Sequence, residues 1–588
     1  MLTNKLFLKY ILIFLFVSDV CAQLPPVFSA EERKRARTSE MVKTYLTPSR
    51  IVWESDRDGE YILNSEKLLE LGNGQVAVND TDLATFKSTE EHKPGILLDF
   101  GREINGGVKI TMGIRESMEP LKLRLRFGES AEEAMSEIGG PTNATNEHSL
   151  RDFIVEVPWL GSIEVGETGY RFLRIDVVEA GQSAPIKSVE AAFVYRDIPY
   201  VGSFVSSDER LNEIWMTGAY TVHLNMQNYL WDGIKRDRLV WVGDLHPEVM
   251  TINTVFGPHD IVPKSLDLAR DQHPLPGWMN GISSYSMWWI LIHKEWYDYH
   301  GNLKYLKEQE DYMTELLDHL SSFIDEDNKE ILDGVRFLDW PTSEKPKAVH
   351  AGLQAMMIMT FEAGSAIMEA YGRYDLKRKY ARIAEQLKIH QPEGNKTKQA
   401  AALMSLAGLG DAEKINKEVL AVNGVRGMST FYGYYILEAM AKAGDYKGAL
   451  NVIRDYWGGM LDLGATSFWE DFQIEDAVTS GRIDELTPTG EDDIHGDFGE
   501  YCYVGYRHSL AHGWASGPTP WLSQYVLGIN VLDGGNKVKI EPHLGDLEFA
   551  KGNFPTKYGV LKVHHQKRKD GSVHTEIEAP EGLIVVSD

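Results

Sequence analysis

The segment Ser206-Ser-Asp-Glu-Arg-Leu-Asn-Glu-Ile-Trp215 marks the point at which the chain changes from strand-like to helical patterning. Ser and Asp are frequent helix N-caps, and acidic residues are favoured in the first turn of a helix. From there, apolar or small residues recur at steps of three and four residues, the spacing of one helix face, at Leu211, Ile214, Trp215, Gly218, Val222 and Met226. The segment therefore predicts the start of a helical domain.

Helical patterns continue along the chain, and many of them stop at a glycine, the residue most often found just past a helix end. We expect helices over 287–299, 305–324, 351–371, 376–389, 397–409, 412–422, 430–442 and 446–460, and a last long helix that begins at His512. About a dozen helices joined by short turns fit an (α/α)6 toroid, in which helix pairs form the spokes. An irregular helical array would give the same periodicity.

Strand-like segments lie on both sides of the helical region. In the N-terminal part they cover 95–100, 108–112, 121–127 and 171–177, and in the C-terminal part 538–542, 559–564 and 583–586. Short apolar or alternating runs separated by Gly, Asn, Asp and Pro are typical of β-sandwiches. We therefore expect a multidomain protein with a signal peptide (1–22), an N-terminal β-sandwich region (23–202), an (α/α)6-barrel catalytic domain (203–528) and a C-terminal β-sandwich domain (529–588).

The first residues resemble a secretory signal. Lys5 and Lys9 precede a short apolar stretch, and the small residues near Ala22 predict cleavage before Gln23. Cleavage would leave Cys502 as the last cysteine, so no disulfide within the chain is expected. We expect a periplasmic or secreted bacterial protein that is not inserted in the membrane after cleavage.

The composition narrows the function classes. The formal net charge of −27 argues against nucleic acid binding, which depends on basic patches that neutralise phosphates. The 14 Trp and 26 Tyr residues are more informative, because flat aromatic faces suit sugar rings, although most of these side chains are expected in the core.

The densest polar cluster is Trp231-Asp-Gly-Ile-Lys-Arg-Asp-Arg-Leu-Val-Trp-Val-Gly-Asp244. Acids and arginines this concentrated between apolar helices need either solvent or a site, and a loop stabilised by its own ion pairs is the simpler alternative. Two later segments carry weaker signals. In Gly464-Ala-Thr-Ser-Phe-Trp-Glu-Asp471 a Trp stands beside a carboxylate, and Ser509-Leu-Ala-His512 brings a histidine to the predicted last helix.

Taken together and in this order, the three segments resemble glycoside hydrolase family 78, the α-L-rhamnosidases. Within the first segment, Asp232, Arg236, Asp237, Arg238, Trp241, Gly243 and Asp244 fall on the family pattern. Trp469-Glu470 and His512 match two later family motifs, and the segment Phe337-Leu-Asp-Trp-Pro341 resembles an aromatic segment between them. Two positions depart from the pattern, because Asp237 stands where the family usually has Glu, and Val240 where it has Gly.

The resemblance implies hydrolysis of a terminal α-L-rhamnose with inversion, in which a protonated carboxyl and an ionised carboxylate roughly 6.5–9.5 Å apart act across the sugar. It implies Asp237 as general acid and Glu470 as general base, with no cofactor and no metal. We expect Asp232, Arg236, Trp241, Asp244, Asp339, Trp340, Trp469 and His512 to bind substrate, a rhamnose-containing oligo- or polysaccharide.

Two other classes of function stay open at this point. One is an enzyme on the same toroid that acts on another sugar, as an exo-glycosidase or a polysaccharide lyase. The other is a carbohydrate-binding relative that has lost catalysis. The sequence leaves the oligomeric state, the aglycone and the linkage undetermined.

Overall fold

The computed structural model describes residues 29–56, 58–72, 74–394 and 396–587, so the expected signal peptide lies outside the described residues. Residues up to Glu40 form a separate unit. Its described part contains helix α1 (Ala30–Thr38), which Ser29 and Glu32 close with reciprocal capping hydrogen bonds. The remaining residues, from Met41 onwards, form the second unit.

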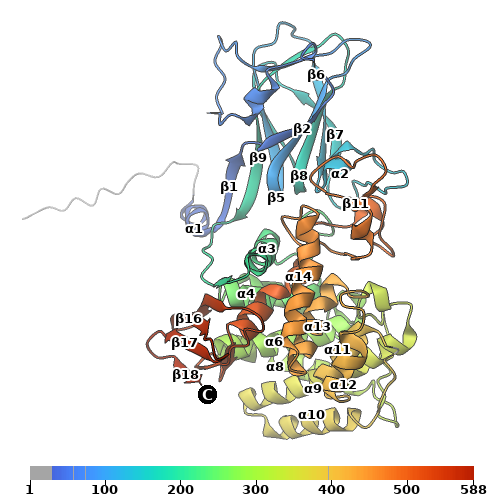
Figure 1. The fold of residues 1–588 in the computed structure, drawn as a ribbon, viewed down its shortest axis with the longest axis vertical. Coiled ribbons are helices and arrows are strands. Elements are labelled where there is room, and N and C mark those ends of the chain that lie inside the picture. Colours follow the sequence, from blue (N-terminus) through green and yellow to red (C-terminus); the bar gives the residue numbers. More distant parts are fainter. Residues whose placement is uncertain (1–28, 57, 73, 395, 588) are drawn as a thin grey trace, which may run out of the picture. The chain divides into compact units, whose positions relative to one another are not determined.

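The N-terminal part of the second unit is a nine-stranded sheet in which each strand is hydrogen-bonded to another (Figure 1). Its strands are β1 (Met41–Leu46), β2 (Arg50–Glu54), β3 (Ile62–Leu63), β4 (Ala84–Lys87), β5 (Gly95–Met112), β6 (Leu121–Gly128), β7 (Asp152–Val157), β8 (Gly161–Val177) and β9 (Ser183–Arg196). The main order is β3-β4-β9-β5-β8-β6-β7, with β1 on β9 and β2 on β5.

The strands predicted over 95–100 and 108–112 are a single strand, β5. Its register against β8 shifts between Asp99 and Ile104 and again between Gly106 and Val108. Bulges of this kind bend a strand without ending it, so the chain continues where the sequence pattern indicated a break. The long strands join the region in one hydrogen-bonded sheet, and its arrangement as a sandwich stays a prediction.

The helical region follows the prediction over most of its length. Its helices are α3 (Glu209–Asn225), α4 (Val242–Val255), α5 (Ile261–Gln272), α6 (Ser283–His300), α7 (Leu303–Glu308), α8 (Glu310–Ser321), α9 (Pro346–Tyr371), α10 (Tyr374–Leu387), α11 (Lys398–Leu406), α12 (Ala412–Ile415), α13 (Thr430–Lys442), α14 (Tyr446–Asp462) and α15 (Pro518–Trp521). Asp208 caps α3 and accepts hydrogen bonds from the amides of Arg210 and Leu211.

Six helices contact one another in the order α4, α6, α9, α11, α13 and α15, and α15 contacts α4. They are called the inner helices below. Around them, α3 packs on α4 and α14, α10 packs on α9, and α14 packs on α13. The predicted last long helix is instead a succession of short pieces. A 3-10 turn (Gly513–Ser516), α15 and a π-helical turn (Leu522–Val526) follow one another, with Pro518 at the start of α15.

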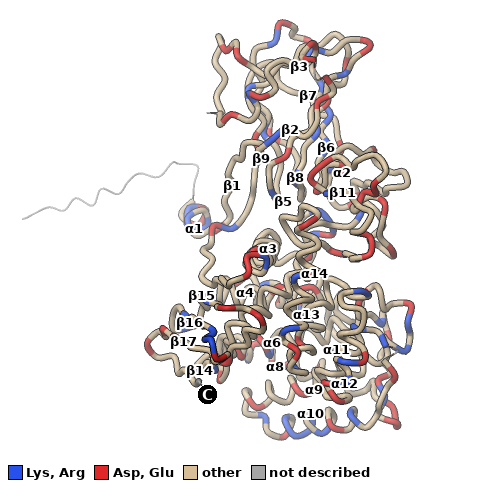
Figure 2. The backbone as a smooth tube through the Cα atoms, viewed as in Figure 1, with Lys and Arg blue, Asp and Glu red and all other residues tan. Residues whose placement is uncertain are grey.

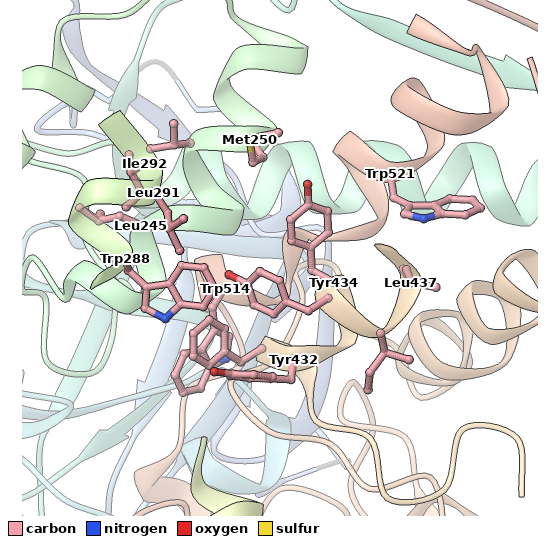
Figure 3. Packing of buried hydrophobic residues seen from close by; sticks show 14 of the residues in the cluster. Leu245, Met250, Trp288, Leu291, Ile292, Tyr432, Tyr434, Leu437, Trp514 and Trp521 are labelled. Atoms are coloured by element: carbon pink, nitrogen blue, oxygen red, sulfur yellow. The ribbon is translucent and has the colours of Figure 1, made fainter. Parts of the chain in front are cut away.

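Aromatic side chains fill the interior of the helical region. Figure 3 shows Trp288, Tyr432, Tyr434 and Trp514 among the buried side chains of one hydrophobic cluster. Trp514 lies parallel to Phe431, with ring centroids 4.8 Å apart. Most of the tyrosines and tryptophans of this region therefore serve the core, as the composition suggested.

The C-terminal strands form two small sheets. One has the order β10-β15-β16-β17 and the other β13-β14-β18. Their strands are β10 (Ser203–Ser206), β13 (Ile529–Leu532), β14 (Lys537–Ile540), β15 (Phe549–Thr556), β16 (Gly559–Lys567), β17 (Val573–Glu578) and β18 (Ile584–Ser587). Because β10 pairs with β15, residues 203–206 belong to a sheet, and the helical region begins at Glu209.

Charged residues of both signs are interspersed along the sheets and the helices (Figure 2). The negative net charge is therefore spread over the fold. Among the described residues, no helix combines the length and the apolar character that crossing a membrane requires.

Candidate active site

The loop between α3 and α4 carries four of the ten predicted site residues, Asp232, Arg236, Asp237 and Trp241. Asp232 closes it, because its amide donates to the Leu239 carbonyl (3.0 Å) and its Oδ1 accepts from the Leu239 amide (2.9 Å). At the tip, Asp237 and Arg238 have left-handed backbone conformations, with φ of 48° and 59°. Outside glycine, this region is entered mainly by Asn, Asp and His, and strained residues of this kind cluster at functional sites. The tip is thus a tight turn that suits Asp at position 237.

A single guanidinium group, that of Arg236, links the two predicted catalytic carboxyl groups. Its Nε lies 3.6 Å from Asp237 Oδ1, and its Nη1 lies 3.4 Å from Glu470 Oε1. Because both nitrogens belong to one rigid group, the two carboxyl groups approach within roughly 9.5 Å, the upper end of the range for inverting glycosidases. The structure therefore brings Asp237 and Glu470 together around Arg236, although they lie far apart in the sequence.

Glu470 is buried and ionised. Burial by itself would raise the pKa of this carboxyl, but the positive charges of Arg236 and His512 and the amide of Ser509 outweigh it and hold the pKa below its ordinary value. The Ser509 amide donates to Glu470 Oε2 at 2.8 Å. A carboxylate that stays charged when buried is suited to accept a proton from water.

Asp237 is the more accessible of the pair, with 20% of its side chain exposed. Its Oδ2 accepts a hydrogen bond from Trp241 Nε1 at 3.0 Å. The same carboxyl faces His148, whose Nδ1 lies 3.1 Å from Oδ1. Asp237 is therefore oriented on both oxygens and still open to a ligand.

Asp232, Asp244 and His512 form a buried group beside this pair. His512 Nε2 lies 2.9 Å from Asp244 Oδ1. Burial alone would lower the pKa of His512, but the carboxylates of Glu470, Asp244 and Asp232 raise it to about 9. Burial raises the pKa of Asp232 well above its ordinary value, with Asp244 and Asp237 adding to the effect. At neutral pH His512 is thus a cation, and the group offers both donors and acceptors to sugar hydroxyls.

The predicted aromatic residues occupy different positions. Trp241 contacts Asp237, and Trp340 stacks near Tyr501, with ring centroids 6.1 Å apart. Trp469 is only 1% exposed and packs its edge against Phe472. Trp241 and Trp340 are partly exposed, whereas Trp469 is buried like Asp232, Asp244 and His512.

Asp339 serves the fold. Its Oδ1 accepts hydrogen bonds from the amide and the hydroxyl of Thr342, and its Oδ2 accepts from the Ser429 hydroxyl at 2.6 Å. Asp339 is 1% exposed. Three of its roughly four acceptor positions cap a turn and anchor α13, and its role as a substrate ligand stays a prediction.

The sequence analysis did not identify His148 and Tyr503. His148 comes from a loop of the N-terminal sheet region and contacts Asp237. The ring of Tyr503 lies 5.9 Å from the guanidinium of Arg236. A lone histidine in a loop and a tyrosine among many follow no periodic pattern, so their part in the site is visible only in three dimensions.

Two cavities are lined mainly by residues of the helical region. One, of about 270 Å³, is lined by Asp471, Tyr501 and Tyr503. Asp471 follows Glu470 in the chain, and the ring of Tyr503 lies near Arg236. Another, of about 550 Å³, lies among the inner helices and is lined by His246 and Glu438. The predicted catalytic residues line neither of these two cavities, so a pocket between Asp237 and Glu470 stays a prediction.

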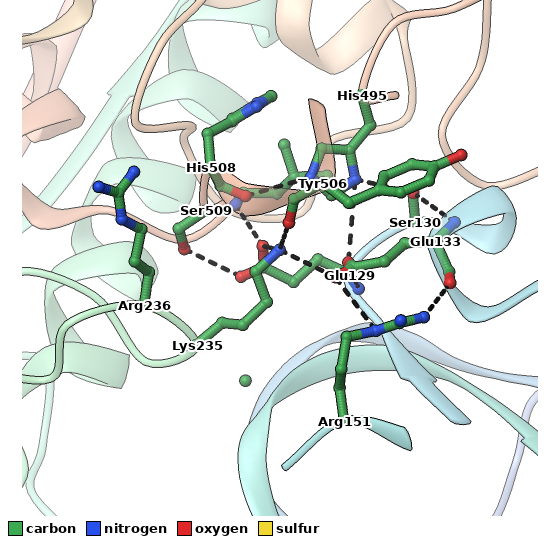
Figure 4. Close-up of polar contacts among 12 residues, drawn as sticks. Glu129, Ser130, Glu133, Arg151, Lys235, Arg236, His495, Tyr506, His508 and Ser509 are labelled. Carbon is green, nitrogen blue, oxygen red and sulfur yellow. Dashed lines mark hydrogen bonds and ion pairs between the residues drawn. The ribbon is translucent and has the colours of Figure 1, made fainter. Parts of the chain in front are cut away.

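Among the described residues, one group has the geometry of a metal site. Ligand atoms of Glu129, Glu133 and His495 lie within 4.8 Å of one another. The ammonium of Lys235 lies 3.0 Å from Glu129 and 3.1 Å from Glu133 (Figure 4). Because this ammonium already supplies the positive charge, the group reads as an internal ion-pair cluster.

Comparisons with known proteins agree with the resemblance stated from the sequence. Residues 199–393 match the family model described as bacterial alpha-L-rhamnosidase 6 hairpin glycosidase domain. Among solved structures, a GH78 family rhamnosidase of Bacillus sp. GL1 is similar at 20% identity, with a TM-score of 0.72 over 90% of this chain and 56% of that one. No match was found among curated proteins.

Two of the similar structures contain the sugar itself. The Streptomyces avermitilis α-L-rhamnosidase complexed with L-rhamnose is 16% identical, with a TM-score of 0.66 over 86% of this chain and 50% of that one. The rhamnosidase from Klebsiella oxytoca with rhamnose bound is 18% identical, with a TM-score of 0.61 over 83% of this chain and 96% of that one. This chain thus has the rhamnosidase fold, while it spans little more than half the length of the Bacillus protein.

Proposed function

Starting from a rhamnosidase-type helical domain, we propose that this chain is an exported glycoside hydrolase. It releases terminal α-L-rhamnose from an oligo- or polysaccharide, with inversion at the anomeric carbon. The observation that carries the proposal is Arg236, whose single guanidinium lies 3.6 Å from Asp237 and 3.4 Å from Glu470. Two carboxyl groups held around one site in this way are the machinery of glycoside hydrolysis.

The two carboxyl groups have different roles in the proposed reaction. As the general acid, Asp237 gives a proton to the glycosidic oxygen as the bond from this oxygen to the anomeric carbon breaks. Glu470, ionised, takes a proton from a water molecule whose oxygen bonds to the opposite face of the same carbon. The leaving group departs as a neutral alcohol, and the sugar is released with inverted configuration.

The other site residues bind and orient the sugar in this proposal. His512 as a cation and Asp244 as its partner hydrogen-bond to ring hydroxyls, together with Asp232. Trp241 and Trp340 provide the apolar wall for the methyl group of the deoxy sugar. Arg236 keeps Glu470 charged and holds the base at a fixed distance from the acid.

For the fold, we propose an (α/α)6 toroid. The closed sequence of contacts from α4 through α6, α9, α11 and α13 to α15 supports an inner ring of helices. The N-termini of α4 and α13 carry or contact the site, through Asp244 on α4 and through the Thr430 hydroxyl, which donates to the Glu470 carbonyl. The site therefore lies at the end of the ring where these inner helices begin.

A hydrolase for another sugar and a polysaccharide lyase are the competing enzymes. A lyase needs a Tyr or His base and a group that neutralises a uronate. Of the histidines near the two carboxyl groups, His512 is a cation bonded to Asp244 and is therefore no base, while Glu470 is the ionised group. The charges thus favour hydrolysis over elimination. A carbohydrate-binding protein without activity is the remaining alternative.

Hydrolysis of a panel of aryl glycosides separates these three possibilities. We expect release of the aryl group from the α-L-rhamnoside, and losses of at least about a hundredfold in kcat for Asp237→Asn and for Glu470→Gln. Glu385→Gln is the matched control, because this acid is exposed on α10 and pairs with Lys388 at 2.8 Å. Hydrolysis of another glycoside alone, or none, would reject the proposal.

A further inference from the structure

A buried polar cluster connects the N-terminal sheet region to both halves of the candidate active site (Figure 4). Glu129 and Glu133 lie at the end of β6 and in α2 (Ala131–Met135), and they are 1% and 0% exposed. Lys235 enters from the loop that carries Asp237, and His495 from the segment after Glu470. Buried charges of this kind are retained only when each has a partner.

Cations and carboxyl groups pair within the cluster, and burial raises the pKa of Glu129 to about 7 although Lys235 opposes this effect. Lys235 Nζ lies 3.0 Å from Glu129 Oε2 and 3.1 Å from Glu133 Oε1, and it donates to the Tyr506 carbonyl at 3.0 Å. Arg151 approaches Glu133 at 3.6 Å. Burial lowers the pKa of His495 well below its ordinary value, so this histidine is neutral.

Glu129 also binds the segment that holds the general base. Its Oε1 accepts a hydrogen bond from the Ser509 hydroxyl at 3.0 Å, and its Oε2 accepts from the Leu510 amide at 2.6 Å. The backbone of Ser509 then makes two bonds to Glu470. Its amide donates to Glu470 Oε2 at 2.8 Å, and its carbonyl accepts from the Glu470 amide at 2.9 Å. Ser509 therefore links Glu129 to Glu470, because it is hydrogen-bonded to both side chains.

The same carboxylate reaches the acid side of the site. Lys235, which it binds, immediately precedes Arg236 and Asp237 in the loop. Three donors, from Lys235, Ser509 and Leu510, therefore converge on Glu129. Replacing a buried ion pair by apolar residues often costs a protein little stability, so the worth of such a group lies in the geometry that it fixes.

We propose that Glu129 is a positioning residue for hydrolysis, which orients Glu470 through Ser509 and holds the loop of Asp237 through Lys235. The inference rests on the proposed function. It gives the N-terminal sheet region a role in catalysis, because a carboxylate on that region sets the distance between an acid and a base carried by the helical region. Groups that orient catalytic residues in this way typically contribute about tenfold to a hundredfold.

The test compares Glu129→Gln with Glu133→Gln. Gln has one acceptor oxygen and an NH₂ group, so at position 129 it cannot accept all three hydrogen bonds. Glu133 is the comparison variant, because it is equally buried and binds the same lysine; it accepts a hydrogen bond from the Glu129 amide at 2.8 Å but makes none to Ser509 or Leu510. We expect E129Q to lower kcat at least about tenfold more than E133Q, with KM changed less than about threefold.

The pH profile gives a readout that a merely structural role would not move. The Ser509 amide helps to hold the pKa of Glu470 down. If Glu129→Gln loosens Ser509, the acid limb of kcat/KM moves to higher pH, and in E133Q it stays in place. The other titratable groups around Glu470 are unchanged in both variants: Arg236, Asp244, Asp471, Tyr503, His508 and His512.

Hydrogen exchange of the Ser509 and Leu510 amides tests the anchoring without any activity. We expect faster exchange in E129Q than in E133Q, and a smaller increase in Ser509→Ala, which loses the hydroxyl's bonds to Glu129 and to the Ala511 backbone but keeps the bond from the Leu510 amide to Glu129, and which serves if E129Q does not fold. Equal exchange, or equal kcat and an unmoved acid limb in E129Q and E133Q, would overturn the proposal. A wild-type protein that cleaves no rhamnoside would instead reject the proposed function and leave the exchange result to decide the anchoring.

Discussion

The structure gives its most specific prediction for the replacement of Asp237 by the longer acid Glu. Asp237 occupies a left-handed turn, with φ of 48°, and its two oxygens face Trp241 Nε1 at 3.0 Å and His148 Nδ1 at 3.1 Å. In Asp237→Glu the carboxyl group moves outward by about one bond, roughly 1.5 Å, and both contacts cannot be kept. The turn is therefore built for the shorter acid, although the family pattern has Glu.

The size of the effect follows from this displacement. Misplacing a catalytic group by about 1 Å costs on the order of a hundredfold, which corresponds to about 2.7 kcal/mol in the barrier. Glu also enters left-handed conformations less readily than Asp, so we expect a loss of about 1 kcal/mol in the free energy of unfolding. The activity loss should thus exceed what the change in stability explains.

The assay is kcat and KM on an aryl α-L-rhamnoside, at a temperature well below the unfolding midpoint of each variant. We expect Asp237→Glu to be about a hundredfold slower than wild type and faster than Asp237→Asn, which has no proton to give. A substantial rate gain in Asp237→Glu would refute the reasoning. It would mean that the backbone has not adapted to Asp, and that the natural protein is a weak or specialised hydrolase.

Three further predictions concern charge. Arg236→Gln should raise the pKa of Glu470 and move the acid limb of kcat/KM to higher pH. Arg238→Gln is the control and should leave the limb in place, because Arg238 pairs with the exposed Glu167. Equal pH profiles would show that Arg236 does not hold the pKa of Glu470 down. Glu470→Gln should keep its affinity for L-rhamnose in calorimetry within about tenfold while losing turnover, since a base acts mainly in the transition state; a parallel loss of binding would make Glu470 a sugar ligand. The pKa of His512 is raised to about 9 in the folded protein, so the stabilising effect of its charge is fully present below the unfolded pKa of about 6.5 and is lost as pH rises through about 9. The Tm difference between wild type and His512→Gln should therefore shrink between these two pH values. A constant difference would contradict the charge assigned to His512.

Regular amphipathic helices were predictable from the sequence because their burial is one-sided. Helices such as α9 and α6 also end at Gly372 and Gly301, which adopt left-handed conformations with φ of 79° and 63°. Helix α4 was missed because every one of its residues is buried, which leaves no polar face to give a period, and because Pro247 interrupts it. The pairing of β10 with β15 joins segments at opposite ends of the helical region, and a local pattern carries no information about such a partner.

The same difference between local patterns and long-range contacts decided which site residues were predictable. The loop from Asp232 to Asp244 was identified because its chemistry is dense over a short stretch of sequence. Glu129 and His148 were not, since each reaches the site from the sheet region through a contact that only the fold creates. Trp469 is as buried as Asp232, Asp244 and His512, and its contact with a sugar stays a prediction like theirs.

The most direct test of the central claim is the anomeric configuration of the first product. In a proton NMR time course with an aryl α-L-rhamnoside and wild-type protein, we expect β-L-rhamnose to appear first and the α-anomer to follow by mutarotation. In parallel, Asp237→Asn and Glu470→Gln should release sugar at least about a hundredfold more slowly. Initial release of α-L-rhamnose, or no release of rhamnose at all, would contradict an inverting rhamnosidase built on Asp237 and Glu470.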